Sequence, residues 1–123
     1  MGNIALLIDD SIASYQLIEK ILQPLDIEVV HASNGEASLT LAQEIKPAII
    51  IVNTRLRGVD GYTVAKALKN DAALGHIPVI ILTATILNRE KARMIETFDG
   101  YITMPFNPAD LRTRVAQILE TTT

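Results

Sequence analysis

Cysteine is absent from the 123-residue sequence, which excludes disulfide bonds, thiolate-bound zinc and thiol nucleophiles. The only histidines are His31 and His76; the sequence shows no partner for either, and both are interpreted as structural. No apolar run approaches the roughly 18 residues that a membrane span requires. The apolar run at residues 4–8 is too short for the core of a signal peptide. We therefore expect a cytoplasmic protein with no membrane contact.

An excess of positive charge is also missing. The formal net charge is −3 and the pI is near 5.3, so the composition gives no reason to expect nucleic acid as a partner of this domain. Hydrophobic residues make up 49% and charged residues 20% of the chain, a balance typical of a folded domain with its own core. At this length we expect a single domain, residues 1–123.

Short apolar runs alternate with segments of helical periodicity along the chain. The runs at residues 4–8, 27–30, 48–52, 79–82 and 101–103 are predicted strands. Helices are predicted after Ser11, from about Glu36 to residue 45, from the pair Asp60-Gly61, over the polar segment 89–96, and at about 108–120 after Asn107. Five strands alternating with five helices predict an α/β fold whose parallel sheet is covered on both faces.

Apolar residues at helical spacing predict which side of each helix is buried. In the first helix the predicted buried positions are Leu17, Ile18, Ile21 and Leu22. In the second helix they are Ala37, Leu41, Ala42 and Ile45.

Polar side chains follow three of the predicted strands. Asp9 and Asp10 come directly after the first strand, Asn53 after the third and Thr83 after the fourth. The fifth strand is followed by the sequence Met-Pro-Phe at residues 104–106. In an open α/β sheet, binding and chemistry gather at the carboxyl ends of the strands, so these residues are the candidate site.

The acidic pair, the Asp60-Gly61 turn, Thr83-Ala84 and the Met-Pro-Phe run occur in an order that resembles a response-regulator receiver domain of two-component signalling. The resemblance covers essentially the whole chain. It implies a flavodoxin-like (βα)5 fold, a doubly wound parallel sheet with strand order 2-1-3-4-5. It also implies a signalling role and no enzymatic activity.

The resemblance implies a role for each matching position. Asp9 and Asp10 match the acidic pair that holds Mg²⁺, with Asp10 the more direct ligand. Thr83 matches the hydroxyl that turns toward the phosphoryl group, and Tyr101 matches the aromatic residue that swings inward on activation. Asn53 stands where the family has the aspartate that accepts the phosphoryl group.

Two positions depart from the family pattern. The amide of Asn53 does not ionise and cannot attack phosphorus as a carboxylate does. Met104 stands where the family has a lysine, and no lysine or arginine occurs between residues 99 and 109 to supply positive charge to the transferred group. These departures predict a pseudo-receiver that acts as a protein-interaction module.

The same departures predict a weak or vestigial Mg²⁺ site, formed by Asp9 and Asp10 with Asn53 and the backbone of Arg55. Two carboxylates about 4 Å apart repel by roughly 4 kcal/mol at an effective dielectric constant of about 20. Either one carboxyl group is protonated or a cation lies nearby. The side chain of Arg55 is the expected cation, folded back over the pocket.

Plainer interpretations stand beside these roles. Asp60 is expected to cap the third helix and not to replace the phosphoacceptor. Thr83 is equally well explained as a residue that satisfies backbone groups at the strand end. Tyr101 is explained equally well by half-buried packing, and Met104 by filling the space of a lysine stem.

The resemblance implies that partners and sister protomers contact the surface formed by the fourth helix, fifth strand and fifth helix. Arg89, Arg93 and Arg112 are expected on it, either to attract an acidic signalling partner or as a solvated face. A homodimer through this surface is compatible with the sequence.

The alternative function is an ordinary phosphoaccepting receiver in which Asn53 was introduced deliberately. A metal-dependent hydrolase lacks a nucleophile and a base in this sequence.

Overall fold

The structure is a computed structural model that describes residues 3–56, 59–83, 89, 93 and 98–121. In chain order its elements are β1 (Asn3–Ile8), α1 (Ile12–Leu22), the 3-10 turn η1 (Gln23–Leu25), β2 (Ile27–Ala32), α2 (Gly35–Ile45), β3 (Ile49–Asn53), β4 (Arg55–Leu56), β5 (Val59–Asp60), α3 (Gly61–Asn70), β6 (Val79–Thr83), β7 (Gly100–Thr103) and α5 (Pro108–Thr121). The polar helix expected at residues 89–96 lies outside the described residues, apart from Arg89 and Arg93. None of the helices in the described part combines the length and apolar character needed to cross a membrane.

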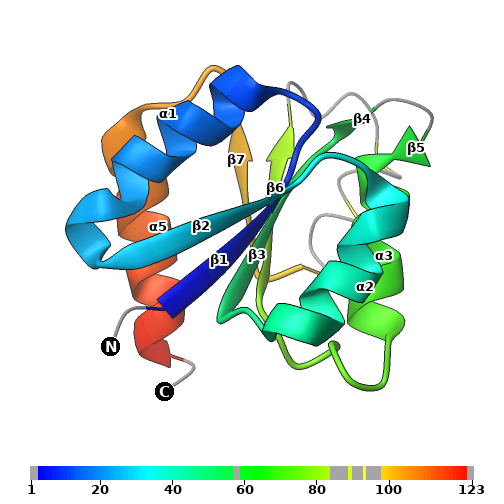
Figure 1. Cartoon of the computed structure of the whole chain (residues 1–123). Coiled ribbons are helices and arrows are strands. Elements are labelled where there is room, and N and C mark those ends of the chain that lie inside the picture. The colour runs from blue at the N-terminus through cyan, green and yellow to red at the C-terminus, as the bar shows by residue number, and fades with distance from the viewer. Residues whose placement is uncertain (1–2, 57–58, 84–88, 90–92, 94–97, 122–123) are drawn as a thin grey trace.

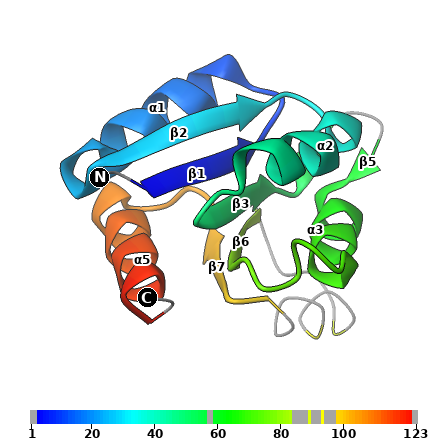
Figure 2. The ribbon, with the colours of Figure 1, turned by 60° about the horizontal axis from the view of Figure 1, so that its bottom comes forward.

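The central sheet has five parallel strands in the order β2-β1-β3-β6-β7. This is the predicted order 2-1-3-4-5, since β6 and β7 are the fourth and fifth strands of the sheet. Figure 2 shows β1, β2 and β3 side by side and running in the same direction. The predicted strands are confirmed with small shifts at their ends. The short antiparallel hairpin β4–β5 was not predicted.

Alternate residues of the central strands face two separate cores. Leu6, Ile8, Ile50 and Val52 pack with α2 and α3, whereas Leu7 and Ile51 pack with α1 and α5. Figure 1 shows α1 and α5 on one side of the sheet and α2 and α3 on the other. Strands buried on both faces are the reason that the sequence reads as continuous apolar runs and not as alternating ones.

Three of the predicted helix starts are confirmed by side-chain caps. Ser11 accepts a hydrogen bond from the Ser14 amide at the start of α1, and Asp60 accepts one from the Tyr62 amide at the start of α3. Asn107 does the same before α5, where its Oδ1 accepts from the Ala109 amide at 2.9 Å. At α2 the cap is Asn34, which accepts from the Ala37 amide.

Two predictions of buried helix positions were wrong. Leu17 is 50% exposed, because the inner face of α1 is formed by Ile18, Ile21 and Leu22. Ala37 is exposed, and Ser38 is buried instead, its hydroxyl donating to the Gly35 carbonyl at 2.6 Å. In α1 the predicted stripe was therefore one residue too wide, and in α2 its first position was one residue too early.

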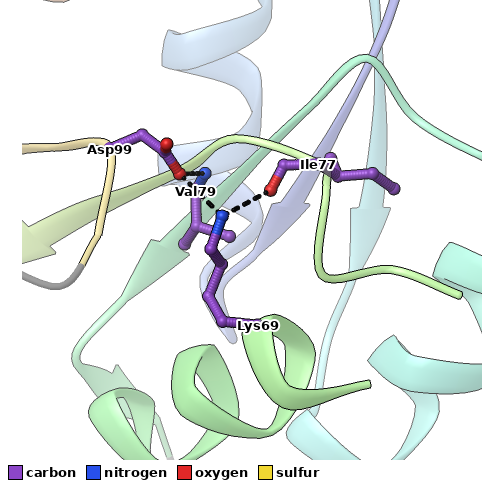
Figure 3. Close-up of polar contacts among 4 residues, drawn as sticks. All are labelled: Lys69, Ile77, Val79 and Asp99. Carbon is purple, nitrogen blue, oxygen red and sulfur yellow. Dashed lines mark hydrogen bonds and ion pairs between the residues drawn. The ribbon is translucent and has the colours of Figure 1, made fainter. Parts of the chain in front are cut away.

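At the end of the sheet away from the candidate site, a polar cluster joins α3 to the start of β6. Lys69 Nζ lies 3.0 Å from Asp99 Oδ2 and donates to the Ile77 carbonyl at 3.2 Å (Figure 3). Asp99 Oδ2 also accepts from the Val79 amide at 2.7 Å. These contacts involve residues before β6 and β7 and so hold the two strand starts together.

Candidate functional site

Strand register brings the predicted polar residues together at one edge of the sheet. Ile8 of β1 is level with Val52 of β3, so Asp9 and Asn53 are neighbours. Asn53 is in turn level with Leu82 of β6, which places Thr83 one residue further out. All three polar side chains are buried, with 1%, 7% and 2% exposure respectively. Buried polar groups need partners, so the contacts of each decide what the site can do.

Asp9 has a hydrogen-bond partner on each carboxylate oxygen. Its Oδ1 accepts from the Ser11 amide at 2.9 Å, and its Oδ2 accepts from Asn53 Nδ2 at 3.0 Å. The other end of the Asn53 amide, Oδ1, accepts from the Arg55 backbone amide at 2.9 Å. The amide orientation is therefore set by both neighbours, because turning it over would place a donor against the Arg55 N–H and an acceptor against the carboxylate.

Gly61 allows α3 to begin directly behind Asn53. A Cβ atom on Gly61 would lie 2.3 Å from the Asn53 carbonyl oxygen and 2.5 Å from Thr54 Cα. The Gly61 amide also donates to the Thr54 carbonyl at 3.3 Å. This close approach of two backbones needs a residue without a side chain. Asp60 is exposed and serves as the cap of α3.

Thr83 is held by a residue that the sequence analysis did not single out. Its Oγ1 lies 3.0 Å from the Tyr62 hydroxyl, and both side chains are buried. Tyr62 is the second residue of α3 and was predicted neither as core nor as site. The residue type alone could have indicated such a contact, because a buried tyrosine generally needs a hydrogen-bond partner for its hydroxyl.

Met104 is partly buried and packs against the core on the α1–α5 side of the sheet, as Tyr15 and Phe106 do. Its backbone amide donates to the Thr83 carbonyl at 2.7 Å. The position that resembles the family's lysine thus carries an apolar side chain in a mainly apolar environment. This placement agrees with the plainer interpretation of Met104.

His31 has two contacts that the sequence did not show, and both agree with its interpretation as a structural residue. Its Nε2 contacts the backbone carbonyl of Asp9, and because a carbonyl only accepts, Nε2 carries the proton. The imidazole stacks on Tyr15 with ring centroids 5.0 Å apart and 6° between the planes. The Tyr15 hydroxyl donates to Glu19 at 2.8 Å, and this bond raises the pKa of the phenol. Strand pairing places His31 there, which sequence periodicity alone does not show. His76 is exposed.

The side chain of Arg55 was expected to fold back over the acidic pair, and the structure bears on this expectation for Asp9 only. The Arg55 side chain is exposed, and among the described residues it forms no ion pair with Asp9. The two oxygens of Asp9 accept instead from the Ser11 amide and from Asn53 Nδ2. Arg55 contributes its backbone amide instead, through the bond to Asn53.

The side chains of the candidate site fit a Mg²⁺ ion poorly. Mg²⁺ requires near-octahedral oxygen ligands at 2.0–2.1 Å. Asn53 directs its NH₂ group, and not its oxygen, at Asp9, so a cation between these two side chains would face hydrogen atoms. Asp10 is partly buried at the next position. Within the described part of the chain, no group of three or more acidic or histidine side chains is placed to hold a metal ion.

The residues predicted for the partner surface do not all share one face. Tyr101 in β7 is 46% exposed, and Arg89 and Arg93 are exposed. Arg112 is not on this face, because its Nε donates to the Ile21 carbonyl of α1 at 2.9 Å. Arg114 is exposed on α5 and lines a groove with Tyr101.

Residues 5–116 match the model of the response regulator receiver domain. The chain belongs to this family. Receiver domains are modules of two-component signalling, and the flavodoxin-like architecture described above is theirs.

Relatives and solved structures agree with the assignment. The phosphate regulon transcriptional regulatory protein PhoB of Pseudomonas aeruginosa is 31% identical over 123 residues, covering 99% of this chain and 54% of the relative. A putative response regulator from Chloroflexus aurantiacus has a TM-score of 0.87 and 29% identity, covering 98% of this chain and 99% of that one. The receiver domain of the sensor histidine kinase PA1611 from Pseudomonas aeruginosa, with magnesium coordinated in its active-site cleft, has a TM-score of 0.85 and 23% identity, covering 98% and 99%. This receiver chain spans about half the length of the curated relatives it matches.

Proposed function

We propose that this receiver domain does not accept a phosphoryl group at position 53 and that it signals by binding a protein partner. The observation that carries the proposal is the state of the Asn53 side chain. It is an uncharged amide, buried at 7% exposure, with its nitrogen on Asp9 and its oxygen on the Arg55 amide. No ionised oxygen is present at the strand end where the family's acceptor stands.

Phosphoryl transfer to a receiver needs a nucleophile that carries negative charge. An aspartate supplies one and forms an acyl phosphate, as in other aspartyl-phosphate chemistry. The amide oxygen of Asn53 is neutral, and an attack on phosphorus would remove it from the Arg55 amide. Resonance ties up the lone pair of the amide nitrogen, which is a donor here. Neither end of the side chain can therefore replace the carboxylate.

The position of Met104 supports the same proposal. Charge develops on the equatorial oxygens during phosphoryl transfer, and catalysis rests on positive groups placed around them. Met104 has none and packs with the apolar core, and residues 99–109 include no lysine or arginine. A receiver that lacks both the nucleophile and the cation has lost two independent requirements.

We further propose that the partner contacts the surface around β7 and α5. Tyr101 is 46% exposed there and offers an aromatic ring with a polar hydroxyl, a side chain enriched at protein interfaces. Arg114 lines the same groove and adds positive charge. With Arg89 and Arg93 exposed nearby in the sequence, an acidic signalling protein is the partner class that this surface suits.

The test is exposure to acetyl phosphate with MgCl₂, followed by intact-protein mass spectrometry. We expect no phosphoryl adduct on the natural chain or on M104K, and a measurable adduct on N53D/M104K. N34D is the matched control, because it makes the same amide-to-acid change at an exposed helix cap. An adduct on the natural chain that peptide mass spectrometry places at residue 53 would contradict the proposal. Labelling of N53D as complete as that of the double variant would favour the alternative, an ordinary receiver blocked only at position 53.

A further inference from the structure

Asp9 and Asn53 form a nearly symmetrical hydrogen-bonded pair between the ends of β1 and β3. Each side chain accepts one bond from the backbone amide two residues further along: Asp9 from Ser11 and Asn53 from Arg55, both at 2.9 Å. The remaining two atoms face each other, Asn53 Nδ2 and Asp9 Oδ2, 3.0 Å apart. The two side chains bond to each other when one of these two facing atoms is a donor and the other an acceptor.

Two carboxylates in this arrangement would place two acceptors in contact within a buried pocket. Oxygen atoms of like charge at this separation repel strongly where water is excluded. They would need a cation or a proton between them. The NH₂ group of Asn53 places a partly positive hydrogen atom against Asp9 Oδ2. Because the amide carries no net charge, it needs no counter-charge of its own.

We propose that the Asn53 carboxamide takes the place of a divalent cation in this pocket, so that the domain is complete without a metal. A cation bound in the same position would displace the bond from Nδ2 to Asp9. It would also require the amide to turn over, which breaks the bond from the Arg55 amide. Binding of Mg²⁺ therefore competes with two existing hydrogen bonds, whereas in a pair of aspartates it relieves repulsion.

This inference rests on the proposed function, since both depend on the amide at position 53. The two can fail separately. Uptake of a phosphoryl group is read from the protein mass, whereas metal dependence is read from stability and from the NMR signals of particular amides. A chain that binds Mg²⁺ but takes up no phosphoryl group would leave the proposed function intact and remove the inference.

The symmetry of the pair gives a decisive test in the absence of metal. D9N places two amides in contact, and N53D places two acids in contact. The exchange variant D9N/N53D restores one of each: the bond between the two side chains is reversed, and the bonds from the Ser11 and Arg55 backbone amides keep their direction. Thermal unfolding is measured for all four proteins in EDTA. We expect the exchange variant to have a higher midpoint than either single variant. An exchange variant with a midpoint as low as the summed effects of the two single changes would overturn the proposal.

The second test adds millimolar MgCl₂. We expect no shift of the unfolding midpoint for the natural chain or for N34D, and a rise of about 5 °C for N53D when Mg²⁺ is at about ten times its dissociation constant. In the natural chain the amide signals of Ser11 and Arg55, the two backbone donors, should not move with Mg²⁺. A saturable shift of both signals, or equal stabilisation of the natural chain and N53D, would show that the metal binds and the proposal is wrong. The NMR titration remains decisive if N53D does not fold.

Discussion

A nitrogen with two hydrogens stands in Asn53 where an aspartate would have a second oxygen. That difference converts an acceptor into a donor directed at Asp9, 3.0 Å away. Thr83, the third buried polar residue at this edge, is in contact with the Tyr62 hydroxyl. Each of the three side chains thus has a partner within the chain. Such satisfied buried networks fix one arrangement of the side chains that form them.

Gly61 gives a prediction about the backbone that supports this pocket. In G61A the added Cβ would lie 2.3 Å from the Asn53 carbonyl oxygen and 2.5 Å from Thr54 Cα. Both obstacles are backbone atoms, which cannot rotate away as a side chain does. We expect a loss of about 3 kcal/mol in the free energy of unfolding, measured by urea denaturation.

G100A is the matched control for this prediction. A Cβ at Gly100 would meet its nearest atoms, in the side chains of Arg114 and Ile118, at 3.5 Å. That is an ordinary van der Waals distance, so we expect a change within about 0.5 kcal/mol. If the two variants lose similar stability, close packing behind Asn53 is not what requires Gly61.

The contact between Lys69 and Asp99 shows how α3 is joined to the sheet. Asp99 precedes β7 and accepts from the first amide of β6, at Val79. Lys69 reaches the same carboxylate oxygen from the last turn of α3 and also donates to the carbonyl of Ile77. The helix and the two strand starts thus share one polar cluster (Figure 3). It lies at the opposite end of the strands from Asn53.

Substitution of Lys69 tests how much this cluster contributes to the free energy of unfolding. The two side chains are 23% and 38% exposed, so solvent screens the ion pair, and its contribution is at most about 1 kcal/mol. We expect K69M to lower the free energy of unfolding by about 0.5–1 kcal/mol. D99A should cost more, about 1–2 kcal/mol, because the Val79 amide also loses its acceptor.

K66M is the control, because Lys66 is an exposed lysine of the same helix. It should leave the urea midpoint unchanged. An equal loss in K66M and K69M would mean that the effect comes from the loss of helix-surface charge and not from the contact with Asp99.

Several elements could be predicted because their signals are local. Apolar runs located the five strands, and Ser11, Asp60 and Asn107 marked helix starts whose caps the structure contains. The exposed positions of Leu17 and Ala37 could not be predicted in the same way. The rotation of a helix about its axis depends on the sheet beneath it, and a stripe one residue too wide satisfies the same periodicity.

In the candidate site, too, the features with a local sequence signal could be predicted and those that depend on three-dimensional neighbours could not. The meeting of Asp9, Asn53 and Thr83 follows from the rule that parallel strands end at one edge. The direction of the Asn53 amide, the contact of Thr83 with Tyr62 and the place of His31 depend on three-dimensional neighbours. The side chain of Arg55 was therefore expected beside the acidic pair, whereas the side chain that contacts Asp9 is the amide of Asn53, two residues earlier.

The whole molecule is one sheet shared by two cores. Residues of β3 alternate between them, with Ile50 and Val52 facing α2 and α3 and with Ile49 and Ile51 facing α1 and α5 (Figure 1). Asn53 ends this same strand, so the candidate site is attached to the element that both cores hold in place.

Ile50 and Ile51 test whether the two cores act as one unit. Both are fully buried, are adjacent in β3 and face opposite sides of the sheet. We expect I50A and I51A each to lose about 3–4 kcal/mol of unfolding free energy, because each leaves a cavity in a packed core. Since both cores share β3, each variant should unfold in a single transition with coincident midpoints by circular dichroism and tyrosine fluorescence. Separate midpoints in either variant would show that one core unfolds while the other remains folded. The candidate site at Asn53 would then be supported by only one of the two cores.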